Sequence, residues 1–259
     1  MAGACLLFDV RPHIAEGLSR RLSARGVACL VLDSSRTDAG LSYAITPDGA
    51  LTELDISGRP IDPATILGSY AELPAARSAP RDPRLPLTPR DFARDERRAA
   101  FAAVRALLPG CLNPPRDGAL AGGFLSPAEQ QARIRRDAPE FADPDSALAD
   151  RDYGSGSDAD KAAGGAICSC LFVGPRQHHF VWTDRGPTPV DPGTVAFARI
   201  GAAVARITRL FGIDAGEARY RFDGTFHFRT LVPMLGHGDA FEAWPAPLDD
   251  LAGRLCGEH

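Results

Sequence analysis

Residues 4–33 read ACLLFDVRPHIAEGLSRRLSARGVACLVLD, and this stretch decides the class of fold. Its two ends, ACLLFDV (4–10) and VACLVLD (27–33), are short apolar runs typical of buried strands. Between them, apolar residues fall on one face of a helix: Ile14, Leu18 and Leu22. Pro12 suits the first turn of that helix, and Gly26 suits its end. The pattern predicts a right-handed βαβ unit with parallel strands.

The rest of the chain predicts a mixture of hairpins and helices. Alternating apolar residues around turn residues indicate hairpins, and apolar residues at 3–4 spacing indicate helices. The capping box at Ser126 and Glu129 marks one helix start. The expected elements are a hairpin over 41–56, a helix over 88–108, a helix over 126–136, a hairpin over 166–184, a helix over 191–211, a hairpin over 218–231 and a helix over 247–256.

The charge composition argues against a nucleic-acid partner. The 259 residues include 29 basic and 33 acidic residues, so the formal net charge is −4 and no broad cationic surface is expected. Lys161 is the single lysine, which excludes mechanisms that need two lysines. No run of eighteen apolar residues and no secretory signal pattern is present, so we expect a cytoplasmic protein. Six cysteines in a chain of this length are typical of buried reduced thiols.

The order of these elements resembles the ATP-grasp ligases, in the branch that modifies ribosomally made peptides (graspetide and microviridin-type ligases). RDFARDERRAAFAAVRALLPGCLNPP (90–115) is similar to a helix that is followed in that family by an asparagine, here Asn113, and prolines. RITRLFGIDAGEARYRFDGTFHFRTLVPMLG (206–236) is similar to the metal-binding region of the family. The resemblance implies an α/β fold, ATP and Mg²⁺ as cofactors, a peptide partner and a homodimer.

The resemblance also implies how the chain is organised. We expect a pre-ATP-grasp-like βαβ domain over 1–75, a proline linker and helices over 76–136, a flexible linker over 137–166, and a C-terminal ATP-grasp-like α+β domain with antiparallel hairpins over 167–259. Between Pro115 and Ile167 the family has a central subdomain, whereas this sequence offers one short helix and a polar connection. We therefore expect the central ATP-grasp subdomain to be largely missing.

Three departures from the family pattern predict a loss of nucleotide chemistry. The family ends its last strand with a Glu, one spacer, an Asn and a Pro, but Thr230 and Val232 stand at the two ligand positions here. Val cannot ligate magnesium, and a Thr hydroxyl does not supply the missing charge. Glu217 is the acidic ligand that this chain retains. The other departures are the missing subdomain and the lone Lys161, because the family uses two lysines and Arg does not match their geometry.

Two other sequence patterns can be interpreted either as functional sites or as ordinary structural features. GSGSDADKAAGG (154–165) lacks the spacing of a phosphate-binding loop, so a flexible linker is favoured. Four residues of the 166–184 hairpin are candidates for a soft metal site, or for a cysteine nucleophile with a histidine base: Cys168, Cys170, His178 and His179. Buried core thiols are the favoured interpretation of this group.

The last hairpin predicts the binding surface. Four basic residues alternate along it and would form a solvated face that suits an acidic peptide or an anionic ligand: Arg219, Arg221, His227 and Arg229. The sequence thus predicts a degenerate ATP-grasp-like pseudoenzyme, without a cofactor, that binds a peptide or a partner enzyme in ribosomal-peptide modification through these residues and Asn113. The alternatives are an active ATP- and Mg²⁺-dependent carboxylate–amine or ester ligase acting on a peptide, and a Cys/His site.

Overall fold

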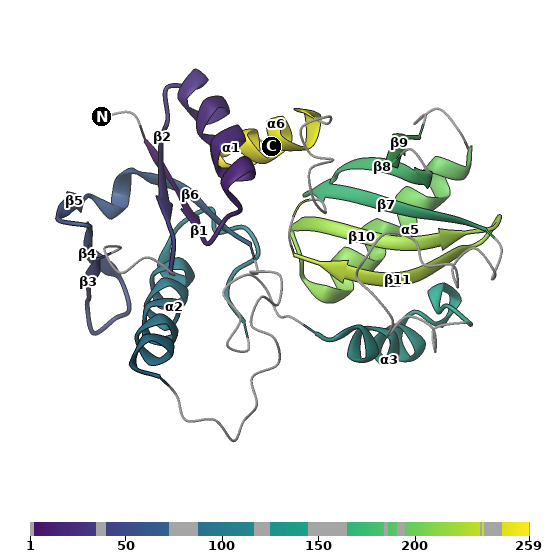
Figure 1. Cartoon of the computed structure of the whole chain (residues 1–259), viewed down its shortest axis with the longest axis horizontal. Coiled ribbons are helices and arrows are strands. Elements are labelled where there is room, and N and C mark those ends of the chain that lie inside the picture. The colour runs from purple at the N-terminus through teal and green to yellow at the C-terminus, as the bar shows by residue number, and fades with distance from the viewer. Residues whose placement is uncertain are drawn as a thin grey trace. The chain divides into compact units, whose positions relative to one another are not determined.

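The fold is mixed α/β (Figure 1). The computed structural model describes residues 3–34, 40–72, 88–116, 125–144, 165–183, 186–190, 195–233, 235 and 245–258. The chain divides into two compact units: unit 1 is residues 1–123 with 248–259, and unit 2 is residues 124–247. The predicted proline linker falls mostly outside the described residues, as does the Gly-rich segment 154–164. The expected loss of the central subdomain therefore remains a prediction.

Unit 1 contains the predicted βαβ unit. Its elements are β1 (Ala4–Phe8), α1 (Pro12–Ala24), β2 (Ala28–Leu32), β3 (Leu41–Ile45), β4 (Leu51–Ile56), β5 (Arg59–Ile61), the 3₁₀ turn η1 (Pro63–Thr65), β6 (Ile66–Ala71), α2 (Pro89–Leu107) and α6 (Pro245–Leu255), which enters from unit 2. The parallel sheet has the order β2-β1-β6, and β3-β4-β5 form a separate antiparallel sheet. The prediction of parallel strands joined by a helix is confirmed.

The two strands of the βαβ unit differ in burial. All five residues of β1 are buried, as expected for a central strand. β2 was predicted to be buried as well, and this prediction is wrong, because β2 lies at the edge of the sheet and pairs with β1 alone among the described strands. Val31 on β2 is 50% exposed.

The last helix, α6, packs on unit 1, although the sequence assigned it to the C-terminal domain. The Leu248 side chain fills the space beside Gly17, and the Arg21 guanidinium forms an ion pair with Asp249 at 2.7 Å. The Cys5 thiol donates to the Leu255 carbonyl oxygen at 3.6 Å. These contacts place α6 beside α1 (Figure 1). No helix among the described residues is long and apolar enough to span a membrane.

Unit 2 is built on one antiparallel sheet of order β11-β10-β7-β8-β9. Its elements are α3 (Pro127–Asp137), the 3₁₀ turn η2 (Pro139–Phe141), β7 (Ala166–Val173), β8 (Arg176–Thr183), β9 (Gly186–Pro189), α5 (Val195–Phe211), β10 (Ala215–Phe222) and β11 (Phe226–Val232). The predicted capping box of α3 is confirmed, and so are both hairpins. α5 covers one face of the sheet, and the core between them includes Cys170, Val204, Ile207, Tyr220 and Phe228.

Helix α3 runs along the outer edge of β11 and takes the place of a further strand. The Gln130 side-chain amide donates to the Leu231 carbonyl at 2.9 Å and accepts from the Leu231 N–H at 2.7 Å. The Gln131 amide donates to the carbonyl groups of Phe228 and Arg229. These bonds satisfy backbone groups that an open edge strand would leave unpaired.

Candidate functional site

The second face of the unit 2 sheet carries polar and charged side chains. Alternation along the strands places Ala218 and Leu231 toward α5, so their neighbours in sequence face the other way. The register pairs Glu217 with Val232 and Arg219 with Thr230. Glu217, Thr230 and Val232, the three predicted ligand positions, therefore lie on one face of the hairpin.

Glu217 lies in a closed polar cluster on this face. Its carboxylate is 1% exposed, and Oε1 accepts from the Ser169 hydroxyl at 2.7 Å and from Arg219 Nε at 2.8 Å. The Trp182 indole N–H donates to the Ser169 hydroxyl at 2.8 Å, and the Arg219 guanidinium lies 5.9 Å from the Trp182 ring centre. Within the described residues, Glu217 Oε2 has no hydrogen-bond partner. The charge of this carboxylate is thus balanced by an arginine of the same chain.

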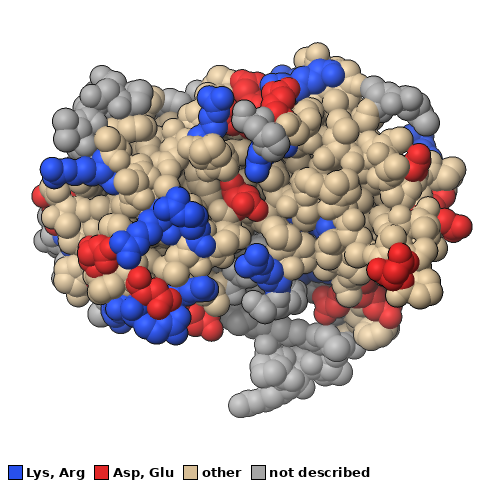
Figure 2. Space-filling model, turned by 180° about the vertical axis from the view of Figure 1, so that it is seen from behind, with Lys and Arg blue, Asp and Glu red and all other residues tan. Residues whose placement is uncertain are grey.

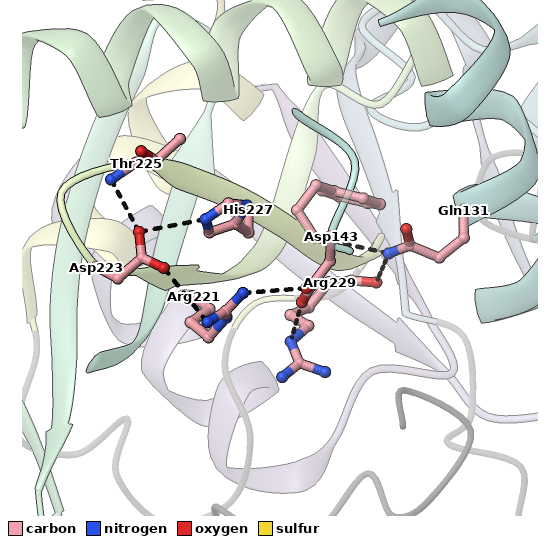
Figure 3. Close-up of polar contacts among 8 residues, drawn as sticks. Gln131, Asp143, Arg221, Asp223, Thr225, His227 and Arg229 are labelled. Atoms are coloured by element: carbon pink, nitrogen blue, oxygen red, sulfur yellow. Dashed lines mark hydrogen bonds and ion pairs between the residues drawn. The ribbon is translucent and has the colours of Figure 1, made fainter. Parts of the chain in front are cut away.

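A second cluster on this unit is organised around Asp143 (Figure 3). The Asp143 side chain is fully buried, and its carboxylate pairs with Arg229 Nε at 2.7 Å and with Arg221 Nη2 at 3.3 Å. Arg221 also reaches Asp223 at 3.3 Å, and His227 Nε2 lies 3.2 Å from the same Asp223 carboxylate. Ala142 bridges to Phe228, so the segment after η2 holds the Asp143 carboxylate against the last hairpin.

The predicted solvated basic face is largely withdrawn from solvent: two of its four residues are buried, and the other two are only partly exposed. Arg221 and Arg229 are 4% and 9% exposed, and the side chains of Arg219 and His227 are 16% and 14% exposed. Arg221 and Arg229 can be buried because the carboxylate of Asp143 is their counter-ion and compensates for their loss of hydration. On the surface seen in Figure 2, basic and acidic side chains are interspersed among larger uncharged areas. The basic residues of the hairpin therefore form ion pairs within the protein.

Asn113 lies in unit 1 and holds a tight turn. It has a positive φ of 52° and is fully buried, just before the prolines of the motif. Arg105, which is also fully buried, donates to the carbonyl oxygens of Leu112 and Asn113 at 2.6 and 3.4 Å. Burial lowers the pKa of Arg105 from its ordinary value. Asn113 is therefore part of a buried turn of unit 1, whereas the basic residues of the hairpin, with which it was predicted to form a binding surface, belong to unit 2.

The Cys/His candidates are split between the two faces of the sheet. Cys170 pairs with His179 in the register on the core face, whereas His178 pairs with Leu171 on the polar face. Burial raises the pKa of the Cys168 thiol to about 11 and also raises that of Cys170, so both favour the protonated form. Among the described residues, no group of three or more His, Cys, Asp or Glu could hold a metal ion. These observations favour core thiols over a metal or nucleophile site.

His179 should make stability depend on pH. Burial lowers its pKa from 6.5 to about 4, and its two ring nitrogens lie within hydrogen-bond distance of Tyr220 and Gln177. The unfolded chain therefore takes up this proton below pH 6.5, while the folded protein resists it down to about pH 4. The contribution of His179 to stability is complete above pH 6.5 and is lost as the pH falls, by up to about 1.4 kcal/mol per pH unit.

Urea unfolding at pH 7 and pH 5 measures this effect. We expect the wild type to lose about 1–2 kcal/mol of unfolding free energy between these values, and His179→Gln to show a smaller loss. The same pH dependence in both proteins would contradict the assignment to His179.

No family model and no curated protein matches the sequence. Among solved structures, the chain is similar to the macrocyclase MdnC of Microcystis aeruginosa MRC bound with precursor peptide MdnA, with a TM-score of 0.66 and 11% identity over 98% of this chain and 99% of that chain. It is equally similar to the ATP-grasp ligase PsnB complexed with minimal precursor, Mg and ADP, with a TM-score of 0.66 and 14% identity over 99% of both chains.

A third similar structure belongs to the same group. It is a RiPP-associated ATP-grasp ligase of Chryseobacterium gregarium in complex with ADP and a leader and core peptide, with a TM-score of 0.62 and 11% identity over 99% of this chain and 97% of that chain. The fold of this chain is therefore that of the peptide-modifying ATP-grasp ligases, in agreement with the resemblance found in the sequence.

The residues at the predicted metal positions do not fit a magnesium site. Magnesium requires several oxygen ligands in near-octahedral geometry and is usually held by carboxylates. Here Glu217 is paired with Arg219, and the facing positions carry Thr230 and the apolar Val232. The Thr230 hydroxyl is directed at Gln130 Oε1 at 3.3 Å. The Arg219 guanidinium already pairs with one oxygen of the carboxylate that a metal would need, and no second carboxylate faces it at Thr230 or Val232.

Proposed function

We propose that this chain is a catalytically degenerate ATP-grasp-like protein that binds a peptide or a partner enzyme in the modification of ribosomally made peptides. The observation that carries the proposal is the ion pair of Arg219 with the buried Glu217 carboxylate, opposite Thr230 and Val232. Such a face lacks the paired carboxylates with which a ligase would hold Mg²⁺, the ion that neutralises the phosphates of ATP. The lone Lys161 agrees with it, because phosphate binding in this fold is expected to use two lysines.

The peptide partner is supported by the fold. MdnC is bound with its precursor peptide, and PsnB with a minimal precursor. In this chain, Arg219 and His227 keep part of their side chains exposed, so they are the residues of the predicted basic surface that a peptide carboxylate could reach. Arg221 and Arg229 would act by holding the hairpin in shape. A homodimer, which the sequence resemblance implies, is part of this proposal.

Isothermal titration of ATP with Mg²⁺ into the wild type tests the proposal. We expect no saturable, magnesium-dependent heat, because the carboxylate that would hold the metal is already neutralised. Binding of ATP that requires Mg²⁺ and is lost in Glu217→Ala would instead favour the active ligase. Glu217→Gln is the matched control, since it keeps the shape of the side chain and removes only the charge.

A further inference from the structure

Strand β2 leaves one edge of the parallel sheet without a neighbour among the described residues. Its sequence, ACLVL, contains no charge and no proline, the features that usually protect an edge strand from pairing. Val31 is 50% exposed and Ala28 is exposed as well. An apolar, uncharged edge of this kind is a surface on which a further strand can pair.

The free edge also presents hydrogen-bonding groups in a defined order. In a parallel pair, alternate residues direct their N–H and C=O groups to the same neighbour. Ala28 donates to the Gly3 carbonyl, and the Leu32 carbonyl accepts from Asp9, so this set of residues faces β1. The backbone groups of Cys29 and Val31 therefore point outward, toward the place of an additional strand.

Among the residues that the structure describes, one flank of helix α1 on the same side is exposed. The Ser19 hydroxyl contacts the Cys29 thiol, so this flank of α1 borders β2, whereas α6 covers the opposite flank through the Arg21–Asp249 ion pair. At about 100° per residue, Glu16 shares the flank of Ser19, and Arg20 lies next to it. Both Glu16 and Arg20 are exposed.

We propose that two copies of this chain associate through β2, with the two β2 strands antiparallel about a two-fold axis at Leu30. Cys29 of each copy then pairs with Val31 of the other. Each pair exchanges two N–H···O bonds, because the backbone N–H and C=O groups of both residues point away from β1. The two three-stranded sheets join into one continuous sheet. The proposal names the surface of the expected homodimer and does not depend on the loss of nucleotide chemistry.

A second copy is the occupant that suits this edge, because the surface is self-complementary under the two-fold axis. Leu30 stands about 10 Å along the strand from Val27. Because α1 runs opposite to β2, the same distance along the helix is about seven residues counted back from Arg25. The two-fold axis therefore passes near Leu18. Strand spacing then separates the two α1 helices by about 10 Å, a normal packing distance. Glu16 of each copy meets Arg20 of the other.

The mass of the protein in solution tests the proposal. By light scattering coupled to size exclusion, we expect the wild type at twice the chain mass of 27.5 kDa. Val31→Lys should give the mass of one chain, because the dimer would bury two unpaired ammonium groups. Phe92→Lys is the matched control, since Phe92 is a 55% exposed apolar residue on α2, and it should remain dimeric. A wild type at 27.5 kDa, or a dimeric Val31→Lys, would overturn the proposal.

A charge exchange checks the register of the two copies. Glu16→Arg and Arg20→Glu should each raise the dimer dissociation constant about tenfold in sedimentation equilibrium, because each turns two attractions into repulsions. The double variant should return to within about threefold of the wild type, because the pairs are restored with reversed signs. Additive weakening in the double variant would overturn the register. Circular dichroism identifies a variant that fails to fold. A monomeric wild type that still binds no ATP would refute this interface and leave the proposed function standing.

Discussion

Asp143→Ala should lower the free energy of unfolding by about 3–5 kcal/mol, because it removes the buried counter-ion of two arginines. The Asp143 carboxylate is completely buried and lies 2.7 Å from Arg229 and 3.3 Å from Arg221. Removing one partner of a buried ion pair leaves a charge with neither water nor a full set of partners, which costs more than the pair itself contributes. Urea denaturation, which does not screen charges, gives the measurement.

Asp223→Ala is the control for this prediction. Asp223 also pairs with Arg221 at 3.3 Å, but its side chain is 35% exposed and water can replace part of the interaction. We expect a much smaller loss of unfolding free energy than in Asp143→Ala, because solvent screens this pair. Equal losses of unfolding free energy in the two variants would contradict the prediction that the buried Asp143 carboxylate stabilises the fold more than the exposed Asp223.

Local signals in the sequence predicted much of the fold correctly. The βαβ unit follows from apolar runs at 4–10 and 27–33, and the start of α3 follows from the capping box at Ser126. The hairpin over 218–231 follows from alternating apolar residues around turn residues, and in the structure its turn lies at Asp223 and Gly224, where Gly224 has a positive φ of 103°. Each of these signals lies within the segment that it describes.

Burial by distant segments could not be predicted. The arginines of the last hairpin alternate like a solvated face, and their burial depends on Asp143, which stands in a segment that resembles a linker. The apolar run of β2 is equally compatible with a central and with an edge strand, because periodicity does not report the number of neighbours. The return of α6 to unit 1 likewise rests on contacts with α1, more than two hundred residues away, such as Arg21–Asp249.

The hydrogen bonds and ion pair of Glu217 could not be predicted from the sequence either. The alternation of β10 places Arg219 on the same face as Glu217, but the choice of partner depends on Ser169 and Trp182 of two other strands. These two residues carry no motif of their own. Their contribution appears once the register of the sheet brings Ser169 opposite Arg219.

The triple variant Arg219→Leu, Thr230→Glu, Val232→Asn should bind a divalent cation that the wild type does not bind. The substitutions add a carboxylate and an amide oxygen on the face of Glu217, and they remove the guanidinium that lies 2.8 Å from its carboxylate. Oxygen ligands of this kind are those that Mg²⁺ prefers. The same variant with Gln in place of Glu at position 230 is the control, because it keeps the size of the side chain without its charge.

Isothermal titration of Mg²⁺ into the wild type and the triple variant, side by side, tests most directly whether the metal site has been replaced by an internal ion pair. The account predicts saturable binding by the triple variant, weaker or absent binding by its Gln control, and none by the wild type. Saturable binding of Mg²⁺ by the wild type that disappears in Glu217→Ala would contradict it.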